Sequence, residues 1–152
     1  IMIAGGMESM TNAPYVMEKA RAGLRMGHAE IKDHMFLDGL EDAETGRLMG
    51  SFAQEIADKK NLTREDMDAF AISSLERANK AIKEGSFEAE IVPVTIKTRK
   101  GEQTVTFDEQ PGNARIAKIR KLRPAFHKDG TVTAANASLI SDGASPFVLM
   151  KE

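Results

Sequence analysis

The chain has no cysteine, which excludes disulfides, thiolate metal ligands and a cysteine nucleophile within its 152 residues. It also lacks tryptophan and has a single tyrosine, and its apolar runs are far too short to span a bilayer. A formal net charge of −2 gives no general attraction to nucleic acid or to an anionic membrane, so an anionic partner must meet a local basic patch. We therefore expect an intracellular protein of a reducing compartment, the cytoplasm, with no membrane or nucleic-acid partner.

The residues that most often perform catalysis or bind metals do not form a recognisable arrangement. His28, His34 and His127 are far apart and none has a metal-ligand spacing. No G-x-S-x-G nucleophile elbow is present, and Gly5-Gly6 is not followed by a phosphate-binding glycine pattern. We predict no catalytic residue and no metal site within this chain.

The first third of the chain shows weak periodicity. The apolar run Ile1–Ala4 predicts a buried strand that ends in a turn at Gly5-Gly6. Residues 7–50 are rich in methionine, glycine and charge, which is typical of irregular structure with short helices. From Met49 onward the spacing predicts a helix whose apolar face is formed by Phe52, Ala53, Ile56 and Ala57.

The clearest predicted element is a helix that begins after Thr63 and stops at Gly85. Thr63 and Asp66 resemble a capping box, and Glu65 and Asp66 lie where the helix dipole favours negative charge. One face collects the small and apolar side chains, and we expect it to be buried: Met67, Phe70, Ala71, Ser74, Ala78 and Ile82.

After this helix the hydrophobic period changes to two. Residues 90–96 and 103–107 predict a hairpin around Arg99–Gly101, with Pro93 at an edge or a bulge. The last predicted strand is Pro146–Met150, with Pro146 at its first position. The chain thus begins and ends with an apolar strand around a polar α+β excursion, as expected for an insert that leaves one sheet and returns to it.

A local basic stretch stands out against the nearly neutral total charge. Arginine and lysine in flexible backbone suit an anionic head group, because the guanidinium donates two hydrogen bonds to a phosphate and lysine supplies a point charge. The stretch is equally compatible with a solvated face that balances the acidic helix. RNA binding is a further option, although Phe126 is the only nearby aromatic residue on which a base could stack. The stretch contains Arg115, Lys118, Arg120, Lys121, Arg123 and Lys128.

Two segments resemble the thiolase family, and within it the acetyl-CoA acetyltransferases (acetoacetyl-CoA thiolases). They are AGGMESMTNAPY at Ala4–Tyr15 and GTVTAANASLISDGA at Gly130–Ala144. DGLEDA at Asp38–Ala43, Leu48–Gly50 and LRPAF at Leu122–Phe126 follow in the family order, so the resemblance extends over essentially the whole chain.

The resemblance implies a fold and a division of the chain. Thiolases carry a long insert, the loop domain, that projects from the first of two similar core halves. The chain is similar to the middle segment of such a protein: an α+β insert flanked by two strands of an α/β thiolase-like core. Residues 1–13 are then the end of the N-terminal core, residues 14–140 the loop domain that covers coenzyme A, and residues 141–152 the returning core strand.

The resemblance also implies the residues that bind coenzyme A. Leu40 and Met49 would line the acyl or pantetheine pocket. Phe126, Ala134 and Ser138 would lie along the pantetheine arm, with the serine hydroxyl hydrogen-bonded to one of its amides. Arg115 is the candidate for the adenine or the phosphates. Leu48 stands where many members have a histidine that shapes the acyl pocket, which leaves the acyl specificity open.

The activity implied for the parent protein is acyl transfer between acetyl-CoA molecules, forming or cleaving acetoacetyl-CoA. Coenzyme A thioesters are substrates and no cofactor is implied; the intact protein is expected to be a homo-oligomer, a dimer or a tetramer. The family uses two cysteines, a histidine and an asparagine-positioned water, none of which matches a residue here, so we predict that this chain alone is an inactive part of a transferase. The alternative is a stand-alone nucleotide- or RNA-phosphate-binding module that uses the basic stretch at 115–128.

Overall fold

The computed structural model describes residues 1–151 and divides them into two compact units. The first unit combines residues 1–56 with the residues from Ala137 onward, and the second unit is Ala57–Asn136. None of the helices formed by residues 1–151 has both the length and the apolar character needed to cross a membrane. The domain boundaries predicted from the family resemblance stay a prediction.

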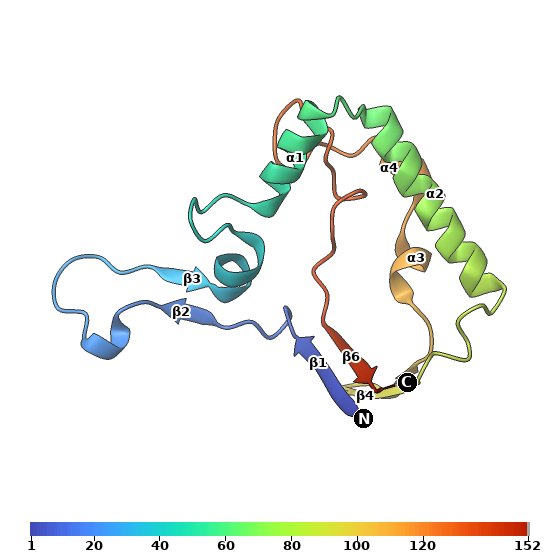
Figure 1. Cartoon of the computed structure of the whole chain (residues 1–152), viewed down its shortest axis with the longest axis horizontal. Helices are drawn as coiled ribbons and strands as arrows, with labels where there is room; N and C mark the ends of the chain where they lie inside the picture. Colours follow the sequence, from blue (N-terminus) through green and yellow to red (C-terminus); the bar gives the residue numbers. More distant parts are fainter. Residues whose placement is uncertain (152) are drawn as a thin grey trace. The chain divides into compact units, whose positions relative to one another are not determined.

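The first unit is built on the pairing of two strands from opposite ends of the chain (Figure 1). Strand β1 (Met2–Glu8) runs antiparallel to β6 (Gly143–Leu149), with Met2 opposite Leu149 and Glu8 opposite Gly143. The predicted turn at Gly5-Gly6 is therefore wrong, because β1 continues through both glycines. A Cβ atom on Gly5 would lie 2.6 Å from the carbonyl oxygen of Ser145, so glycine is needed there for close approach rather than for a turn.

The expected position of Pro146 at the start of its strand is also wrong. Pro146 lies in the middle of β6, directly opposite Gly5. A proline cannot donate to a strand ladder, but within the described residues β6 pairs with β1 alone. The missing N–H can therefore be tolerated on this two-stranded ribbon.

A loop after β1 is tied to the turn that precedes β6. The backbone N–H of Thr11 donates to a carboxylate oxygen of Asp142 at 2.9 Å, across 131 residues of sequence. This hydrogen bond lowers the pKa of Asp142 from its ordinary value of 3.8, helped by the hydroxyls of Thr11 and Ser9 and by the N–H of Met10. The carboxylate thus binds the segment that follows β1 to the residue immediately before β6.

A short hairpin was not predicted from the sequence. Strand β2 (Tyr15–Met17) pairs with β3 (Ile31–Asp33), and the 3₁₀ turn η1 (Ala20–Ala22) lies in the connection between them. Lys32 and Glu18 form an exposed ion pair at 3.1 Å across the hairpin. Strands of three residues are too short to show a period-two pattern, which is why this segment resembled irregular structure.

Helix α1 (Met49–Lys59) forms where the sequence predicts it, but its buried face differs from the prediction. Ala57 is buried as expected, whereas Ile56 is 55% exposed and Ala53 is exposed. The polar Gln54 is buried instead. Apolar spacing alone therefore did not identify the buried face of this helix.

In the second unit, helix α2 (Arg64–Lys83) confirms the predicted start and stop. The hydroxyl of Thr63 accepts the N–H of Asp66 at 3.1 Å and donates to the Asp66 carboxylate at 2.6 Å. Gly85 adopts a φ of 69°, the left-handed conformation that ends helices. The predicted buried face is only partly right, because Phe70 is 78% exposed while Asp68 is buried.

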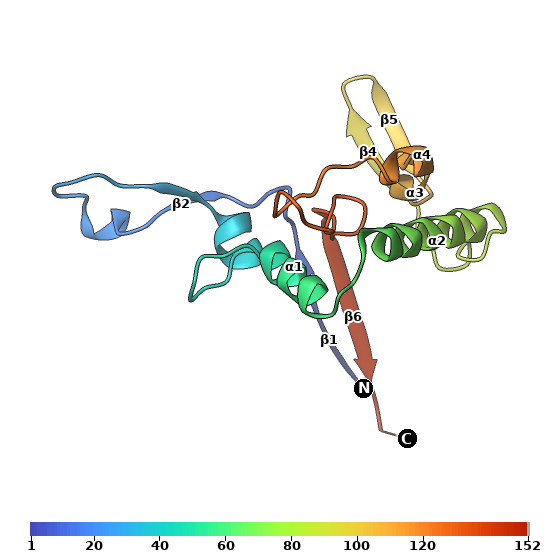
Figure 2. The same cartoon turned by 90° about the horizontal axis from the view of Figure 1, so that it is seen from above.

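The rest of the second unit is a hairpin and two short helices. Strands β4 (Val94–Thr98) and β5 (Gly101–Val105) confirm the hairpin, with Pro93 immediately before β4 rather than inside it. Figure 2 shows this hairpin extending away from α2. Helices α3 (Glu109–Asn113) and α4 (Ile116–Ile119), which were not predicted from the sequence, pack against α2.

Candidate functional site

Leu40 and Met49 lie at the two ends of a closed loop in the first unit. Leu40 is the last residue of the π-helical turn η2 (Phe36–Leu40), and Met49 is the first residue of α1. An isolated antiparallel bridge joins Glu41 to Leu48, so the backbone brings the neighbours of both predicted site residues together. Met49 is 45% exposed and Leu40 is half-buried. The bridge thus brings the backbone next to Leu40 close to the backbone next to Met49.

Asp42 closes the loop between these two residues. Its carboxylate accepts the N–H and the hydroxyl of Thr45 at 2.8 and 2.6 Å, and its backbone N–H donates to the carbonyl of Arg47 at 2.9 Å. The hydroxyl of Thr45, followed by its N–H, lowers the pKa of Asp42. Asp42 therefore acts in the structure as a turn-forming carboxylate with no sign of acid–base chemistry.

Arg47 fastens the same loop to α1. Its guanidinium forms an ion pair with Glu55 and lies 4.5 Å from the centroid of the Phe52 ring. A cation over an aromatic face adds an attraction of roughly 0.5–1 kcal/mol at an exposed site. Three sets of contacts thus hold the loop between Leu40 and Met49: the Glu41–Leu48 bridge, the hydrogen bonds of Asp42, and the contacts of Arg47 with α1.

Phe126 and Ala134 are brought together in the second unit by a second isolated bridge. Pro124 pairs with Thr133, and the N–H of Ala125 donates to the carbonyl of Val132 at 2.9 Å. Phe126 follows one side of this bridge and is half-buried, while Ala134 follows the other side and is exposed. This bridge gives the two predicted pantetheine contacts a common backbone support.

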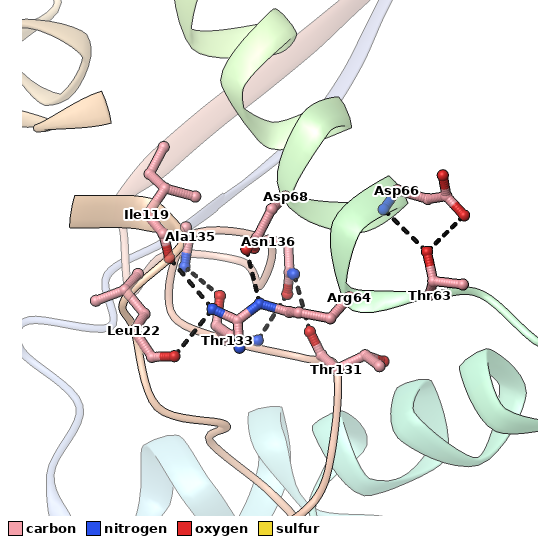
Figure 3. A network of polar contacts seen from close by, with 10 residues as sticks. All are labelled: Thr63, Arg64, Asp66, Asp68, Ile119, Leu122, Thr131, Thr133, Ala135 and Asn136. Atoms are coloured by element: carbon pink, nitrogen blue, oxygen red, sulfur yellow. Dashed lines mark hydrogen bonds and ion pairs between the residues drawn. The ribbon is translucent and has the colours of Figure 1, made fainter. Parts of the chain in front are cut away.

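The turn around Ala134 is fixed by partly buried hydrogen bonds (Figure 3). The Asn136 side chain accepts the N–H of Thr133 at 2.7 Å and donates to the carbonyl of Thr131 at 3.2 Å. The Thr133 hydroxyl accepts the N–H of Ala135 at 3.2 Å, and Thr133 is fully buried. Because buried polar atoms are costly to leave unpaired, these contacts specify one turn conformation.

Arg115 and the rest of the basic stretch are solvent-exposed. Arg115 precedes α4 in an extended conformation and its carbonyl accepts the N–H of Lys118 at 2.9 Å. Within residues 1–151, none of the six basic side chains of the stretch forms an ion pair. Their positive charge is therefore available to an anion.

Ser138 is exposed and belongs to the first unit, outside the named helices and strands. Bridges between neighbouring residues thus support Leu40 and Met49 in the first unit and Phe126 and Ala134 in the second, whereas Arg115 and Ser138 each lie in exposed backbone next to no such bridge among the described residues.

One cavity was not anticipated from the sequence. A hollow of about 430 Å³ lies at the C-terminal end of α2, and none of the predicted site residues lines it. Its walls come from α2, the segment after α2, residues 106–108 after β5, and helix α3; they include Ile82, Phe87, Ile91, Phe107 and Pro111. In the described part of the chain no three acidic, histidine or cysteine side chains are grouped so as to hold a metal ion.

Comparison with known proteins identifies the family of the chain. Residues 1–152 match the family described as Thiolase, N-terminal domain. The chain belongs to the thiolase family.

This thiolase-family chain is similar to proteins named acetyl-CoA acetyltransferase. It is 49% identical over 152 residues to an acetyl-CoA acetyltransferase of Pseudomonas aeruginosa, covering 99% of the chain and 39% of that protein. An acetyl-CoA acetyltransferase of Saccharomyces cerevisiae is 48% identical, with 100% of the chain and 39% of that protein covered. The chain spans about two fifths of the length of these curated relatives.

Solved structures agree with this assignment. An acetyl-CoA acetyltransferase from Syntrophomonas wolfei superposes with a TM-score of 0.85 at 46% identity, covering 95% of the chain and 36% of that protein chain. A human mitochondrial 3-ketoacyl-CoA thiolase gives a TM-score of 0.81 at 39% identity, covering 93% and 36%. At such identities the likeness extends beyond the fold to the family.

Proposed function

We propose that the complete protein that carries this chain transfers acetyl groups between coenzyme A thioesters, forming or cleaving acetoacetyl-CoA. The observation that carries the proposal is the match of all 152 residues to the thiolase N-terminal family, together with relatives at 48–49% identity named acetyl-CoA acetyltransferase. Within that protein, this chain covers and binds coenzyme A and supplies no catalytic residue.

The division of the chain is part of this proposal. Residues 14–140 form the coenzyme-A-covering loop domain, and residues 1–13 and 141–152 are strands of the N-terminal core. The antiparallel pairing of β1 with β6 supports it, because the segment between two adjacent strands leaves and rejoins the core at one place.

The proposal names six coenzyme A contacts, four of which lie next to the backbone bridges described above. Leu40 and Met49 meet the acyl or pantetheine end, while Phe126, Ala134 and Ser138 lie along the pantetheine arm. Arg115 meets the adenine or the phosphates. In support of these assignments, Met49, Arg115, Ala134 and Ser138 are exposed, and the basic stretch around Arg115 has charge to offer an anion.

The chemical step requires residues outside this chain. A cysteine thiolate attacks one thioester and takes its acyl group, releasing coenzyme A. A second cysteine removes the α-proton of acetyl-CoA, and the carbanion attacks the acyl-cysteine carbonyl, releasing the first cysteine as its thiolate. Zero cysteines among 152 residues leave both roles to the remaining three fifths of a protein as long as the relatives. We therefore propose that this chain alone does not turn over substrate.

The proposed function is tested by titrating the complete protein with CoA and with ADP in a calorimeter. CoA is expected to bind more tightly than ADP because its pantetheine arm adds apolar contact. Phe126→Ala should weaken CoA binding about tenfold, equivalent to about 1.4 kcal/mol, and leave ADP binding unchanged. Arg115→Ala should weaken the binding of both ligands.

Phe107→Ala is the matched control, since Phe107 is a 58% exposed aromatic residue of the same unit that lines the separate cavity. Equal affinity for CoA and ADP would contradict the proposal. Tight RNA binding that falls steeply with salt and ignores pantetheine would support the alternative phosphate-binding module instead.

The assembly of the protein is proposed to be homo-oligomeric, a dimer or a tetramer. The β2–β3 hairpin supports this proposal, because its connection and the first residue of β3 present large apolar side chains to solvent. Met26 is 99% exposed, Leu24 52% and Ile31 62%. Apolar surface of this kind on an extended hairpin favours burial against another copy.

A further inference from the structure

Arg64, the first residue of α2, connects three parts of the second unit through one guanidinium (Figure 3). Its Nε atom donates to the Asp68 carboxylate at 2.8 Å. Its Nη2 atom donates to the carbonyl of Leu122 at 2.9 Å and to the carbonyl of Ile119 at 3.2 Å. The arginine thereby holds the end of α4 and the following turn against the first turn of α2.

The two carbonyls that Arg64 holds lie next to the proposed coenzyme A contacts. Ile119 is four residues after Arg115, and Leu122 is four residues before Phe126. Leu122 also leads directly into the Pro124–Thr133 bridge that supports Phe126 and Ala134. A change in the position of the Arg64 guanidinium would therefore shift the backbone only four residues from Arg115 and from Phe126.

The Arg64–Asp68 pair is poorly suited to a purely stabilising role. The side chains of Arg64 and Asp68 are 22% and 3% exposed, so both charges have lost most of their hydration. The Oδ1 atom of Asp68 is buried with no hydrogen-bond partner among the described residues. Buried ion pairs often contribute no more stability than apolar residues of the same volume, because desolvation offsets their attraction. What the pair does provide is a fixed geometry.

Arginine is the residue type that this geometry requires. Its planar guanidinium can donate to a carboxylate and to two carbonyls at once, in fixed directions. A lysine ammonium is a compact charge on a flexible stem, so it could neutralise Asp68 without holding both Ile119 and Leu122.

We propose that Arg64, oriented by Asp68, is a positioning residue for the coenzyme A contacts of residues 115–126. It does not touch the ligand. It fixes the backbone from which Arg115 and Phe126 extend, and this inference rests on the proposed function in that it assumes coenzyme A binds there. Loss of Arg64 is expected to weaken the binding of the CoA thioester rather than to slow the chemical step.

The test compares four variants of the complete protein by steady-state kinetics with acetyl-CoA. Arg64→Met should raise KM about tenfold with kcat within a factor of about two or three of wild type, because about 1.4 kcal/mol of binding corresponds to tenfold. Arg64→Lys should give an intermediate KM. Arg77→Met is the matched control, an exposed arginine of the same helix for which the same change should leave KM unaltered.

Arg64→Met leaves the Asp68 charge buried and unpaired, which can prevent folding. The double variant Arg64→Met/Asp68→Leu removes both charges and is expected to fold with near wild-type thermal stability. Its KM should nevertheless stay raised, and amide hydrogen exchange should be faster at residues 116–126 than in the Arg77→Met control. A raised KM in a variant with near wild-type thermal stability would thus not be a consequence of lost stability.

A double variant that folds and has the wild-type KM would overturn the positioning role, as would a kcat that falls while KM is unchanged. If the wild-type protein itself shows no affinity for CoA, the proposed function fails and the positioning role fails with it. CoA binding by wild type with equal KM values for Arg64→Met and Arg77→Met overturns the positioning role alone.

Discussion

Gly5 shows how the lack of a side chain controls the pairing of β1 with β6. A Cβ atom at this position would lie 2.6 Å from the Ser145 carbonyl oxygen and 2.7 Å from the Cα atom of Pro146, both of which are backbone atoms that cannot rotate away. Gly6, one residue later in the same strand, has no atom within 4 Å of the corresponding position. The two glycines therefore differ in function although they are adjacent in sequence.

Gly5→Ala is expected to destabilise the protein by about 1–3 kcal/mol, the usual effect of forcing extra volume into a close contact. Urea denaturation followed by circular dichroism measures the change. Gly6→Ala is the matched control and should be close to neutral. Equal stabilities of the two variants would contradict the close approach seen between the strands.

Asp142 gives the stability of the first unit a dependence on pH. The N–H of Thr11 is the main cause of the lowered pKa of this carboxyl. A group whose pKa is lower in the folded than in the unfolded state stabilises the fold above its unfolded pKa, and this stabilisation is lost as the pH falls through the folded value.

Wild type is therefore expected to be more stable than Asp142→Asn at neutral pH. The difference should shrink as the pH is lowered below 3.8, the ordinary pKa of the carboxyl. Melting temperatures of both proteins between pH 7 and pH 2 measure it. Curves that stay parallel down to the lowest pH would show that the carboxylate is not held by the loop after β1.

Helix α2 is the element whose boundaries depend most clearly on local chemistry. Thr63→Ala removes the oxygen that accepts the Asp66 N–H and is expected to cost about 1 kcal/mol. The midpoint of urea unfolding should fall with an unchanged slope. Ser74→Ala, an exposed hydroxyl in the middle of the same helix, is the control and should have no destabilising effect.

The β2–β3 hairpin is the element expected to control assembly. Replacing Leu24 and Met26 with aspartate should shift the complete protein to a smaller oligomer, because charge cannot be buried unpaired in an apolar contact. Light scattering after size exclusion measures the mass. Arg21→Gln, in the same connection, removes a charge without removing apolar surface and should leave the mass unchanged.

Elements with strong local signals were predictable and those without them were not. The cap at Thr63, the stop at Gly85 and the turn between β4 and β5 follow from residue type and spacing, and all three are confirmed. The strands β2 and β3 and the short helices α3 and α4 contain three to five residues each, which is too few for a periodic pattern. The exposed Phe70 and the buried Asp68 depend on tertiary contacts that spacing does not encode.

The site was predictable to a different degree. The six proposed coenzyme A residues came from family resemblance, and their roles stay predictions. The supports beneath them were not foreseen, because the bridges Glu41–Leu48 and Pro124–Thr133 join residues that no local pattern connects. The same is true of Arg64, whose carbonyl partners are 55 and 58 residues away.

At the scale of the whole molecule, the chain covers only part of the length of its relatives, and this limits the activity expected of the chain alone. It spans 39% of two curated acetyl-CoA acetyltransferases and contains no cysteine. We expect the purified 152-residue chain to form no acetoacetyl-CoA from acetyl-CoA in an absorbance assay of the product enolate, and we expect the complete protein to form it. Turnover by the chain alone would contradict the absence of catalytic residues.

The pairing of β1 with β6 also makes the intervening chain exchangeable. Both ends of the segment meet at the Gly143–Glu8 end of the ribbon, where Thr11 and Asp142 are hydrogen-bonded, so a replacement needs only to match that junction. Doubling the length of a flexible connection between fixed ends adds only about 0.6 kcal/mol of closure entropy. We therefore expect residues 14–140, the proposed cover, to be transferable from one thiolase onto the strand pair of another, which would give chimeras whose proposed cover and catalytic core come from different parents.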